Sequence, residues 1–558
     1  MTIERKKVMW NGWGWTARAD HLAAREEIWS WLASEIGMPS LLATPTRPLE
    51  ELTIAEARLS PSERRSLVAI LGADRVRDDA FERASHARGR SYQDLVRLRA
   101  GNLGELPDAV LYPRGADEVL EVLAFASEGG IAVVPYGGGT SAVGGVNAHA
   151  GGLRAIVSLD LSAMDRVIEI DTMSGVATVE AGLGGASLEK SLAARSLTLG
   201  HFPESFEFST LGGWIAHRGA GQLCNRYGGP QEWLLSAKLA TPRGILATEE
   251  FPVSATGPHL KDLIIGSEGV FGVITEARLR IRPAPESRAY QGYLFRDFAS
   301  GMTAIRQAMR EDIPAAMLRL SDARETGFYR ALDNIGRETS IAQRLADAYL
   351  EFRGFDAHAA LMIAAFEGTS RSAAAARRGF HAIAGRLGAV SLGNSLGERW
   401  LRDRYRGPYV RDSMLDRSLG VDTLETAATW SKLPALYAAV RNTLESSIRQ
   451  SAPYPAARGI VMCRIGHAYP EGASLLFTYI FPRAFDGEVT QWQSIKKAAT
   501  EAVIAHGGAL SHHHGVGEEH LPWMMTQKSP LGLDVLRAVK RTLDPKAILN
   551  PGKLIPPE

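Results

Sequence analysis

The amino-acid sequence predicts an α+β fold with a helical N-terminal region, and three observations support that class. Strand-like and helix-like segments alternate over residues 101–283, with glycine-rich loops between them. Long helical stretches mix with strand-like pieces over residues 284–500. Residues 1–100 are rich in Arg, Ala, Leu and Glu, and residues 501–558 form a C-terminal segment. With 558 residues, the chain can bury more than one core.

The N-terminal region is expected to be helical over residues 17–37 and 61–72. The second of these has a typical helix start, because Ser60 precedes Pro61 and Glu63 follows. Tryptophans are concentrated near the start of the chain, at Trp10, Trp13 and Trp15. We expect them to pack this tail onto the body of the protein, with an anchor at a membrane interface as the alternative.

The segment over residues 101–283 reads as strand, helix, strand and glycine loop, followed by further strands. Apolar side chains recur with a helical period over residues 117–127, between strand-like residues 109–112 and 131–135. Residues 274–283 alternate apolar and charged side chains, which is typical of a half-buried strand. Further strands are expected at residues 155–159, 167–170 and 177–181.

The second mixed domain, over residues 284–500, is expected to contain both long helices and strands. The helices are expected at residues 340–353 and 370–385, and the strands at residues 359–365 and 473–480. From Trp492 onward the sequence again looks helical. This mixture predicts a second α+β domain.

Composition excludes several classes of protein. The formal net charge is +1, with 63 Lys and Arg against 62 Asp and Glu, so overall charge gives no support for nucleic-acid binding. The two cysteines, Cys224 and Cys463, exclude a disulfide framework and a Cys-built metal site, and they favour a reducing compartment. The N-terminus lacks the apolar run of a secretory signal, and the longest apolar-leaning stretch, residues 472–482, is far short of the ~20 residues that span a bilayer. We therefore expect a cytoplasmic protein, with peripheral membrane contact as an open alternative.

A glycine-rich loop follows the strand-like residues 131–135. Consecutive glycines permit positive φ angles and let backbone N–H groups approach an anion such as a pyrophosphate. The spacing matches neither the dinucleotide-binding G-x-G-x-x-G motif nor a Walker loop, and a flexible turn is the alternative. The candidate cofactor-binding residues here are Pro135, Tyr136, Gly137, Gly138, Gly139, Thr140 and Ser141.

Two further blocks strengthen this interpretation, because the order and spacing of three such blocks within one domain are more specific than any one of them. The first is a polar and aromatic loop with the candidates Glu204, Ser205, Phe206, Glu207, Phe208, Ser209 and Thr210. The second has the candidates Gly266, Ser267, Glu268, Gly269, Val270, Phe271 and Gly272.

Three consecutive histidines, His512, His513 and His514, form the fourth candidate feature. In an extended segment the first and third would point to one side and the second to the other. Imidazoles titrate near neutral pH, so the block suits an acid–base and anion-binding cluster. A His-rich surface turn is the alternative, a zinc site is a minor one, and no metal site is expected.

The glycine blocks resemble the FAD-binding domain of the vanillyl-alcohol oxidase superfamily of flavoproteins. The resemblance implies a PCMH-type FAD-binding domain over residues 101–283, a substrate-binding cap over 284–500, and a C-terminal segment over 501–558 that completes the flavin site. It also implies that the first loop wraps the pyrophosphate while the later loops hold the adenine, ribitol and flavin ring. Several members attach the flavin to a His near the first loop, where this chain has Tyr136 and glycines, so non-covalent FAD is expected.

The triple-histidine block narrows the resemblance to the ether-lipid-forming branch of that superfamily, over nearly the whole chain. This branch replaces the acyl chain of acyl-dihydroxyacetone phosphate with a long-chain alcohol, and FAD undergoes no net redox change. The resemblance implies that Tyr469 and the three histidines are catalytic. It implies that Arg411, Arg319 and His201 bind substrate or lie near the flavin.

These implied roles agree with the chemistry of the side chains. An arginine grips phosphate with a fixed fork of donors, although Arg411 beside Asp412 could also be a surface residue. A tyrosine with a pKa near 10 needs nearby positive charge to act as a base at neutral pH. We expect the triple-histidine block and Arg411 to supply that charge to Tyr469, with a buried core tyrosine as the alternative.

Two departures from the family pattern keep alternatives open. The candidate flavin contacts His217, Arg218, Gly219 and Ala220 follow Ala216, and the family usually has Ser and Thr at Ala216 and His217. The ending at residues 550–554 is more typical of D-lactate and glycolate oxidases. An FAD-linked D-2-hydroxy-acid dehydrogenase or oxidase is therefore the second hypothesis, and a non-catalytic flavin-fold protein is the third. No peroxisomal address is visible, and a homodimer is expected.

Overall fold

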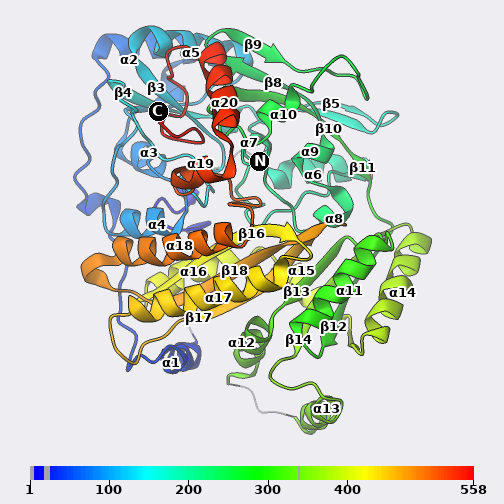
Figure 1. The fold of residues 1–558 in the computed structure, drawn as a ribbon. Coiled ribbons are helices and arrows are strands. Elements are labelled where there is room, and N and C mark those ends of the chain that lie inside the picture. The colour runs from blue at the N-terminus through cyan, green and yellow to red at the C-terminus, as the bar shows by residue number, and fades with distance from the viewer. Residues whose placement is uncertain (1–4, 18–24, 337–339, 558) are drawn as a thin grey trace.

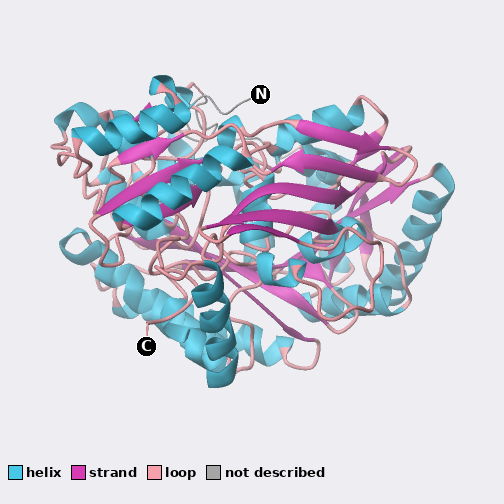
Figure 2. Ribbon diagram, turned by 90° about the horizontal axis from the view of Figure 1, so that it is seen from above, coloured by secondary structure: helices cyan, strands magenta, loops and turns pink. Residues whose placement is uncertain are grey.

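The computed structural model describes residues 5–17, 25–336 and 340–557. Helices and strands mix along the whole chain, around three sheets and a two-stranded pair (Figure 1). Seen from above, the strands occupy the interior and many helices lie outside them (Figure 2). The predicted α+β class is confirmed.

The first sheet has the strand order β1-β2-β4-β3 and carries the glycine loop at the end of β3. Strands β2 and β3 both pair with β4 in parallel, and β1 pairs with β2 in the antiparallel sense. Helix α5 (Ala116–Gly129) connects β2 to β3, as predicted, and α2 (Pro61–Leu71) begins with the capping box of Ser60 and Glu63. The strands are β1 (Val76–Arg77), β2 (Ala109–Leu111), β3 (Ile131–Tyr136) and β4 (Ala155–Asp160).

The second sheet is antiparallel, in the order β5-β6-β10-β8-β9, and it shares one apolar core with the first. Its strands are β5 (Val167–Asp171), β6 (Val176–Glu180), β8 (Leu234–Thr241), β9 (Gly244–Ala247) and β10 (Val273–Arg280). The single strand predicted over residues 274–283 is wrong at its end. Strand β10 stops at Arg280, and β11 (Arg282–Pro283) turns away to pair with β7 (Leu197–Thr198).

The third sheet has seven antiparallel strands in the order β15-β12-β14-β13-β17-β18-β16. Its strands are β12 (Ser287–Phe295), β13 (Met317–Ser321), β14 (Ala360–Gly368), β15 (Val390–Gly393), β16 (Leu419–Thr429), β17 (Ile460–Ala468) and β18 (Gly472–Pro482). One face is covered by α11 (Phe298–Arg310), α14 (Ser370–Arg386), α17 (Leu433–Gln450) and α18 (Glu488–Ala505) (Figure 1).

The other face of this sheet is turned toward a cavity, because side chains alternate along a strand. On β13, Leu318 and Leu320 pack into the helix-covered core, whereas Arg319 points to the cavity. Helices α1 (Glu26–Glu35), α12 (Ala323–Asn334), α15 (Ser395–Asp403) and α16 (Gly407–Leu415) lie on this side.

The N-terminal region is divided between the two halves of the molecule. Helix α1 packs on the seven-stranded sheet and lies below it in Figure 1, whereas α2 packs on the first sheet. The helix predicted over residues 17–37 is described only from Glu26, and residues 18–24 lie outside the described residues. Trp13 is buried against Phe208, which confirms the expected packing of the tail.

The C-terminal segment runs back from the third sheet to the first. After α18 the chain passes the triple-histidine block, α19 (Met524–Gln527) and α20 (Pro530–Leu543). Leu549 then forms a parallel bridge with Val133 of β3. This path brings the histidines of the tail between the two halves. The remaining helices are α3 (Ala80–Ser85), α4 (Tyr92–Arg99), α6 (Gly185–Ala193), α7 (Leu211–Ala216), α8 (Cys224–Tyr227), α9 (Pro230–Trp233), α10 (Lys261–Ile264) and α13 (Ile341–Phe352).

Candidate active site

A cavity of about 820 Å³ lies where the first two sheets meet the seven-stranded sheet. Its wall has three parts: glycine-rich loops, a polar group that includes His513 and several arginines, and an apolar part between α1, α12 and α16. All seven candidates of the first glycine loop, from Pro135 to Ser141, line it. The loop at the end of β3 therefore faces the cavity, as predicted.

The first glycine loop forms a cradle that only glycine can occupy. A Cβ on Gly138 would overlap the backbone carbonyl of Phe208, and one on Gly137 would overlap the hydroxyl of Thr210. Gly139 has φ +69°, in the left-handed region that favours glycine. Backbone N–H groups exposed in this way bind phosphate oxygens, so the loop fits the pyrophosphate of a dinucleotide.

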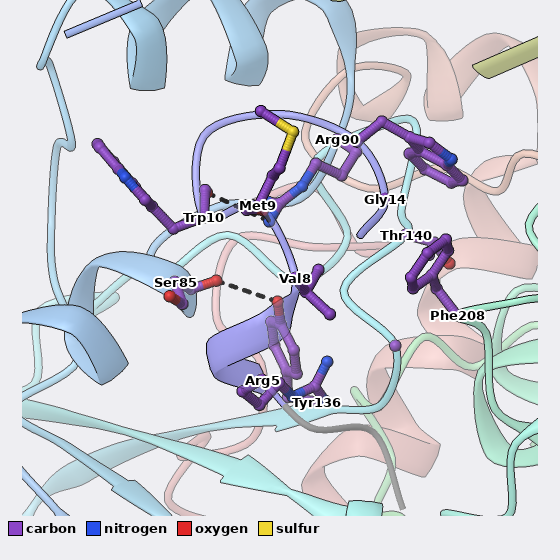
Figure 3. A pocket seen from close by; sticks show the side chains of 12 residues that line it. Arg5, Val8, Met9, Trp10, Gly14, Ser85, Arg90, Tyr136, Thr140 and Phe208 are labelled. Atoms are coloured by element: carbon purple, nitrogen blue, oxygen red, sulfur yellow. Dashed lines mark hydrogen bonds between the residues drawn. The ribbon is translucent and has the colours of Figure 1, made fainter. Parts of the chain in front are cut away.

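The N-terminal segment over residues 5–15 packs beside this loop, which the sequence did not predict. Figure 3 shows a small pocket between the two, with Arg5 and Tyr136 on one side and Arg90 reaching the N-terminal backbone. The guanidinium of Arg90 donates to the carbonyls of Met9 and Trp10 at 3.1 and 3.2 Å. Arg90 also lines the main cavity, so it adds positive charge near the cradle.

The second and third blocks contribute only some of their predicted residues to the wall. The lining residues are Glu204, Ser205, Ser209, Thr210, His217, Gly219, Ala220, Glu268, Gly269 and Gly272. The predicted residues that do not line this cavity, in the described part of the chain, are Phe206, Glu207, Phe208, Arg218, Gly266, Ser267, Val270 and Phe271. The apolar members of this group are buried in the core, because the loops present backbone and small polar groups to the cavity. Their flavin contacts stay predictions.

The triple-histidine block is linked to Tyr469 by a chain of short contacts. The hydroxyl of Tyr469 lies 2.6 Å from Nε2 of His512, and Nδ1 of His512 lies 3.0 Å from Nδ1 of His513. His513 and His514 line the cavity. Tyr469 and His512 are not among the described residues that form its wall. The imidazole of His513 is therefore the point where this chain of contacts meets the cavity.

The buried carboxylate of Glu425 holds the backbone of the triple-histidine block in place. Glu425 on β16 accepts hydrogen bonds from the backbone N–H groups of His512, His513 and His514 at 2.8–3.0 Å. It also accepts one from the hydroxyl of Ser511 at 2.7 Å. Burial alone would raise the pKa of Glu425, but the imidazoles of His513 and His514 outweigh it and hold that pKa well below its usual range.

The three imidazoles differ in pKa, because their electrostatic environments differ. Burial lowers the pKa of His512 to about 4 and that of His514 to about 3, so both are neutral at pH 7. For His513, the attraction of Glu425 outweighs burial and raises the pKa. Of the three imidazoles, that of His513, which lines the cavity, therefore binds a proton most readily.

The pKa of Tyr469 does not shift as the sequence predicted. Burial raises it well above its usual value, and Cys224, Glu232 and Glu425 raise it further, whereas Arg218 acts in the opposite direction. The expectation that the histidines and Arg411 supply positive charge to this tyrosine is wrong, because His512 is neutral there. Tyr469 carries its proton at neutral pH, and His512 is its hydrogen-bond partner.

Arg411 and Arg319 both line the cavity, as their predicted substrate-binding role requires. Nε of Arg411 is buried and has no hydrogen-bond partner among the described residues, so it is a donor available to a ligand. The guanidinium of Arg319 pairs with Glu325 at 3.2 Å, and Glu325 also pairs with Arg464 at 3.1 Å. Arg464 lines the cavity too, so the polar wall carries more cationic groups than the two predicted.

His201 is placed differently from the arginines. It is buried between Trp214 and Trp233, with ring centroids 4.6 and 5.3 Å away, and it is absent from the described cavity wall. Neither of its ring nitrogens has a hydrogen-bond partner among the described residues, and burial lowers its pKa to about 3. The geometry gives no support to substrate contact by His201, and that role stays a prediction.

The residues present fit FAD better than a metal ion. The glycine cradle fits a pyrophosphate, and the buried Nδ1 of His217 on the wall has no partner among the described residues, which leaves it free for a ring substituent of the cofactor. Ligand nitrogens of His467, His512 and His513 do lie within 4.8 Å of one another. However, Tyr469 and His513 already occupy both nitrogens of His512.

Sequence reasoning missed Glu425, Arg464, Arg90 and His467. No local signal in the sequence marked the first two as part of the site. A carboxylate in a strand and an arginine beside a cysteine are common in protein sequences and form no recognisable motif. Only the pairing of β16 and β17 with β18 brings both near the tail.

Comparison with known proteins identifies both halves of the chain. Residues 107–248 match the model of the FAD binding domain family, and residues 284–554 match that of the C-terminal domain of FAD linked oxidases. The prediction of FAD as the cofactor is thereby confirmed. A glycolate oxidase subunit of Bacillus subtilis (strain 168) is 25% identical, over 80% of this chain and 89% of its own length.

Other relatives are more similar and share one name. The alkyldihydroxyacetonephosphate synthase of Dictyostelium discoideum is 31% identical, over 99% of this chain and 94% of its own length. That of Trypanosoma brucei brucei is 34% identical, over 87% and 79%. A solved structure of an alkyldihydroxyacetonephosphate synthase superposes with a TM-score of 0.84 at 29% identity and covers 99% of both chains. With near full-length similarity in sequence and fold, this chain belongs to the alkyldihydroxyacetonephosphate synthase family.

Proposed function

We propose that this chain is a flavin-dependent transferase that replaces the acyl chain of acyl-dihydroxyacetone phosphate with a long-chain fatty alcohol. The fatty acid leaves, and the product is alkyl-dihydroxyacetone phosphate. The observation that carries the proposal is the composition of one cavity, which combines a dinucleotide cradle, cationic side chains, the imidazole of His513 and an apolar part. Each of these parts matches one part of the reaction.

The cationic groups suit the phosphate of the substrate. Arg411 presents a buried, unpartnered Nε, and a guanidinium binds phosphate oxygens through fixed parallel donors. Burial strengthens such a contact, because water competes for the donors less than at the surface. Bound FAD supplies an electron-accepting ring that returns to its starting oxidation state.

The apolar part of the cavity suits a fatty chain. It is lined by Ile28, Leu32, Phe328, Leu332, Met414 and Ile480. Each buried CH₂ of a ligand gains roughly 0.8 kcal/mol, so a long alkyl chain is held strongly in such a space. A small D-2-hydroxy acid, the substrate of the second hypothesis, has no chain to fill it.

The proton chemistry is assigned to the His513 side of the wall. His513 can give a proton to a departing carboxylate when it is protonated, or take one from an incoming alcohol when it is neutral, and Glu425 raises its pKa. Tyr469 exchanges protons with it through His512. His514, neutral and facing the cavity, can accept or donate a hydrogen bond to substrate.

The test is incorporation of labelled hexadecanol into alkyl-dihydroxyacetone phosphate by the purified FAD-loaded protein, with release of the fatty acid. Protein that lacks FAD is the control. Candidate D-2-hydroxy acids are added anaerobically in parallel. Bleaching of the flavin by one of them, without ether product from hexadecanol, would replace this proposal with the redox hypothesis.

We also infer contact with a lipid membrane through α13. Ile341, Leu345 and Phe352 share one face of this helix and are 78%, 67% and 88% exposed. Helix α13 is tied to α12 by an ion pair between Asp347 and Arg330 at 2.7 Å, and Tyr329 of α12 lines the cavity. A substrate with a fatty chain would reach the apolar cavity from a membrane on this side.

Helix α13 does not carry an excess of basic residues. The helix has Arg344 but also Asp347 and Glu351, so apolar contact rather than charge supports the membrane interaction. Of the helices in the described residues, none is long and apolar enough to cross a membrane.

A cytoplasmic location and a homodimer remain proposals, to be tested by cell fractionation and by light scattering.

A further inference from the structure

Glu425 is a carboxylate enclosed by the loop that it holds. It lies in the middle of β16, is 3% exposed, and is absent from the described wall of the cavity. Four donors converge on it: the hydroxyl of Ser511 and the three N–H groups of the histidines. Charge-assisted hydrogen bonds of this kind are about twice as strong as neutral ones. The backbone of the triple-histidine loop is therefore fixed by one side chain from another domain.

In this fixed loop, the imidazoles of His512 and His513 share one proton in the hydrogen bond between them. Nδ1 of His512 and Nδ1 of His513 lie 3.0 Å apart, so one of them must donate and the other accept. If His513 donates, His512 carries its own proton on Nε2 and donates to the oxygen of Tyr469. If His512 donates, its Nε2 is an acceptor and Tyr469 donates to it. The two arrangements give Tyr469 opposite roles.

Glu425 decides between these arrangements through charge. One of its oxygens lies 3.4 Å from Nδ1 of His513. A negative charge there favours the state in which His513 carries protons on both nitrogens, and such an imidazolium must donate from Nδ1. The other groups that face His513 are Glu204, Arg464, His201, His467, His512 and His514.

We propose that Glu425 is a positioning residue for the reaction, which fixes the triple-histidine loop and makes His513 the proton donor to His512. This inference rests on the proposed function for its effect on turnover. Its effect on the protonation of His513 is independent of that function. Both effects can be measured on the FAD-loaded protein.

The first variant is Glu425→Gln, which keeps the shape of the side chain and removes its charge. We expect turnover to fall by about 10- to 100-fold, less than the 10²–10⁴ typical of losing a general acid or base itself. The limb of the pH–rate profile that reports loss of the His513 proton should move to lower pH, because the group that holds this proton is gone. FAD content per chain should stay at the wild-type level.

The matched control is Ser511→Ala, which removes one hydrogen bond to the same carboxylate and leaves the charge. It should lower turnover by less and leave the pH limb in place. Glu425→Asp keeps the charge on a shorter side chain. In this variant the limb of the pH–rate profile should lie close to its wild-type pH. These two variants also preserve the test if Glu425→Gln fails to fold or to hold FAD.

A second measurement does not depend on the reaction. Histidine labelled with ¹³C at Cε1 allows the titration of His513 to be followed by NMR in wild type, Glu425→Gln and Ser511→Ala. We expect the midpoint to fall only in Glu425→Gln. An unmoved midpoint and pH limb in that variant would overturn the proposal, even if turnover falls. If wild type shows no alkyl transfer but the midpoint shifts, the proposed function fails and the placement of the proton stands.

Discussion

The hydroxyl oxygen of Tyr469 lies 2.6 Å from Nε2 of His512, and this hydrogen bond joins the end of β17 to the C-terminal loop. Burial raises the pKa of the tyrosine and lowers that of the histidine to about 4, so each group is neutral at pH 7. Transfer of a proton from the tyrosine to the histidine would create a pair of charges, so a third group that gives or takes a proton favours it. His513, 3.0 Å further on, is that group, and it reaches the cavity.

Replacing Tyr469 with Phe removes the hydroxyl and keeps the ring. We expect turnover to fall by about 10²–10⁴-fold, as for loss of a group that takes part in general acid–base catalysis. FAD content should stay unchanged, because Tyr469 lies outside the described cavity wall. The measurement is incorporation of labelled hexadecanol together with the flavin spectrum. Tyr437→Phe, which removes a hydroxyl bonded to Asp322 on the other side of the sheet, is the control. Near-normal turnover in Tyr469→Phe would remove the tyrosine from the relay.

Arg411→Lys tests the phosphate site. Lysine keeps the positive charge but loses the planar fork, and its single nitrogen cannot replace the buried Nε donor. We expect KM for acyl-dihydroxyacetone phosphate to rise about 10-fold or more, as loss of a charge-assisted hydrogen bond of ~1.5–3 kcal/mol implies. Arg449→Lys, an exposed arginine on α17, should leave KM unchanged. Equal KM values for the two variants would place the phosphate elsewhere on the cationic wall.

Gly138→Asp tests the dinucleotide cradle. The new side chain would overlap the carbonyl of Phe208, and its charge would oppose a pyrophosphate, so the purified variant should lack FAD. Gly115→Ala, at a position with open space around the Cβ, should bind FAD as wild type does. Acid treatment of wild type should release about one FAD per chain. Flavin that stays on the denatured protein would contradict non-covalent binding.

Asp160 predicts a pH dependence of stability. Burial alone would raise its pKa, but Arg5 and His86 outweigh burial and hold it at about 2. Because this folded-state pKa lies below the unfolded value near 3.9, the stabilisation is complete above about pH 5 and is lost as pH falls toward 2. The shift corresponds to about 2.6 kcal/mol. Urea unfolding of wild type and Asp160→Asn should show that difference at pH 7 and about half of it at pH 3. A difference independent of pH would contradict it.

Local chemistry explains which features could be predicted from the sequence. The capping box at Ser60, the helix of residues 117–127 and the glycine cradle depend on neighbours in the chain, and all three are found. The position of α1 could not be predicted, because its apolar face is satisfied by strands more than 380 residues away, including Ile460. The relation of Glu425 to the histidines is of the same kind, since the nearest of them lies 87 residues away in the sequence.

The same distinction applies to side-chain roles within the site. The type and order of Tyr469, Arg411 and the three histidines indicated a proton-transfer and phosphate site. Their protonation depends on burial and on partners from other strands, and neither is written in the local sequence. The error over the charge around Tyr469 arose in this way, because a cluster of three histidines looks positive until burial makes two of them neutral.

Membrane contact through α13 predicts a variant that separates substrate delivery from chemistry. Phe352→Asp places a charge on the most exposed apolar residue of the helix, 88% exposed and at its last turn. We expect flotation with anionic phospholipid vesicles to fall, because a carboxylate in the apolar layer must be desolvated. The fold should be unaffected, since this side chain is largely in solvent. Turnover with substrates dissolved in detergent should match wild type, whereas turnover with substrates in vesicles should drop. Phe485→Asp, at an exposed phenylalanine that precedes α18, is the matched control and should float as wild type does. If both variants float equally well, even at low salt, α13 is not the surface that meets the lipid.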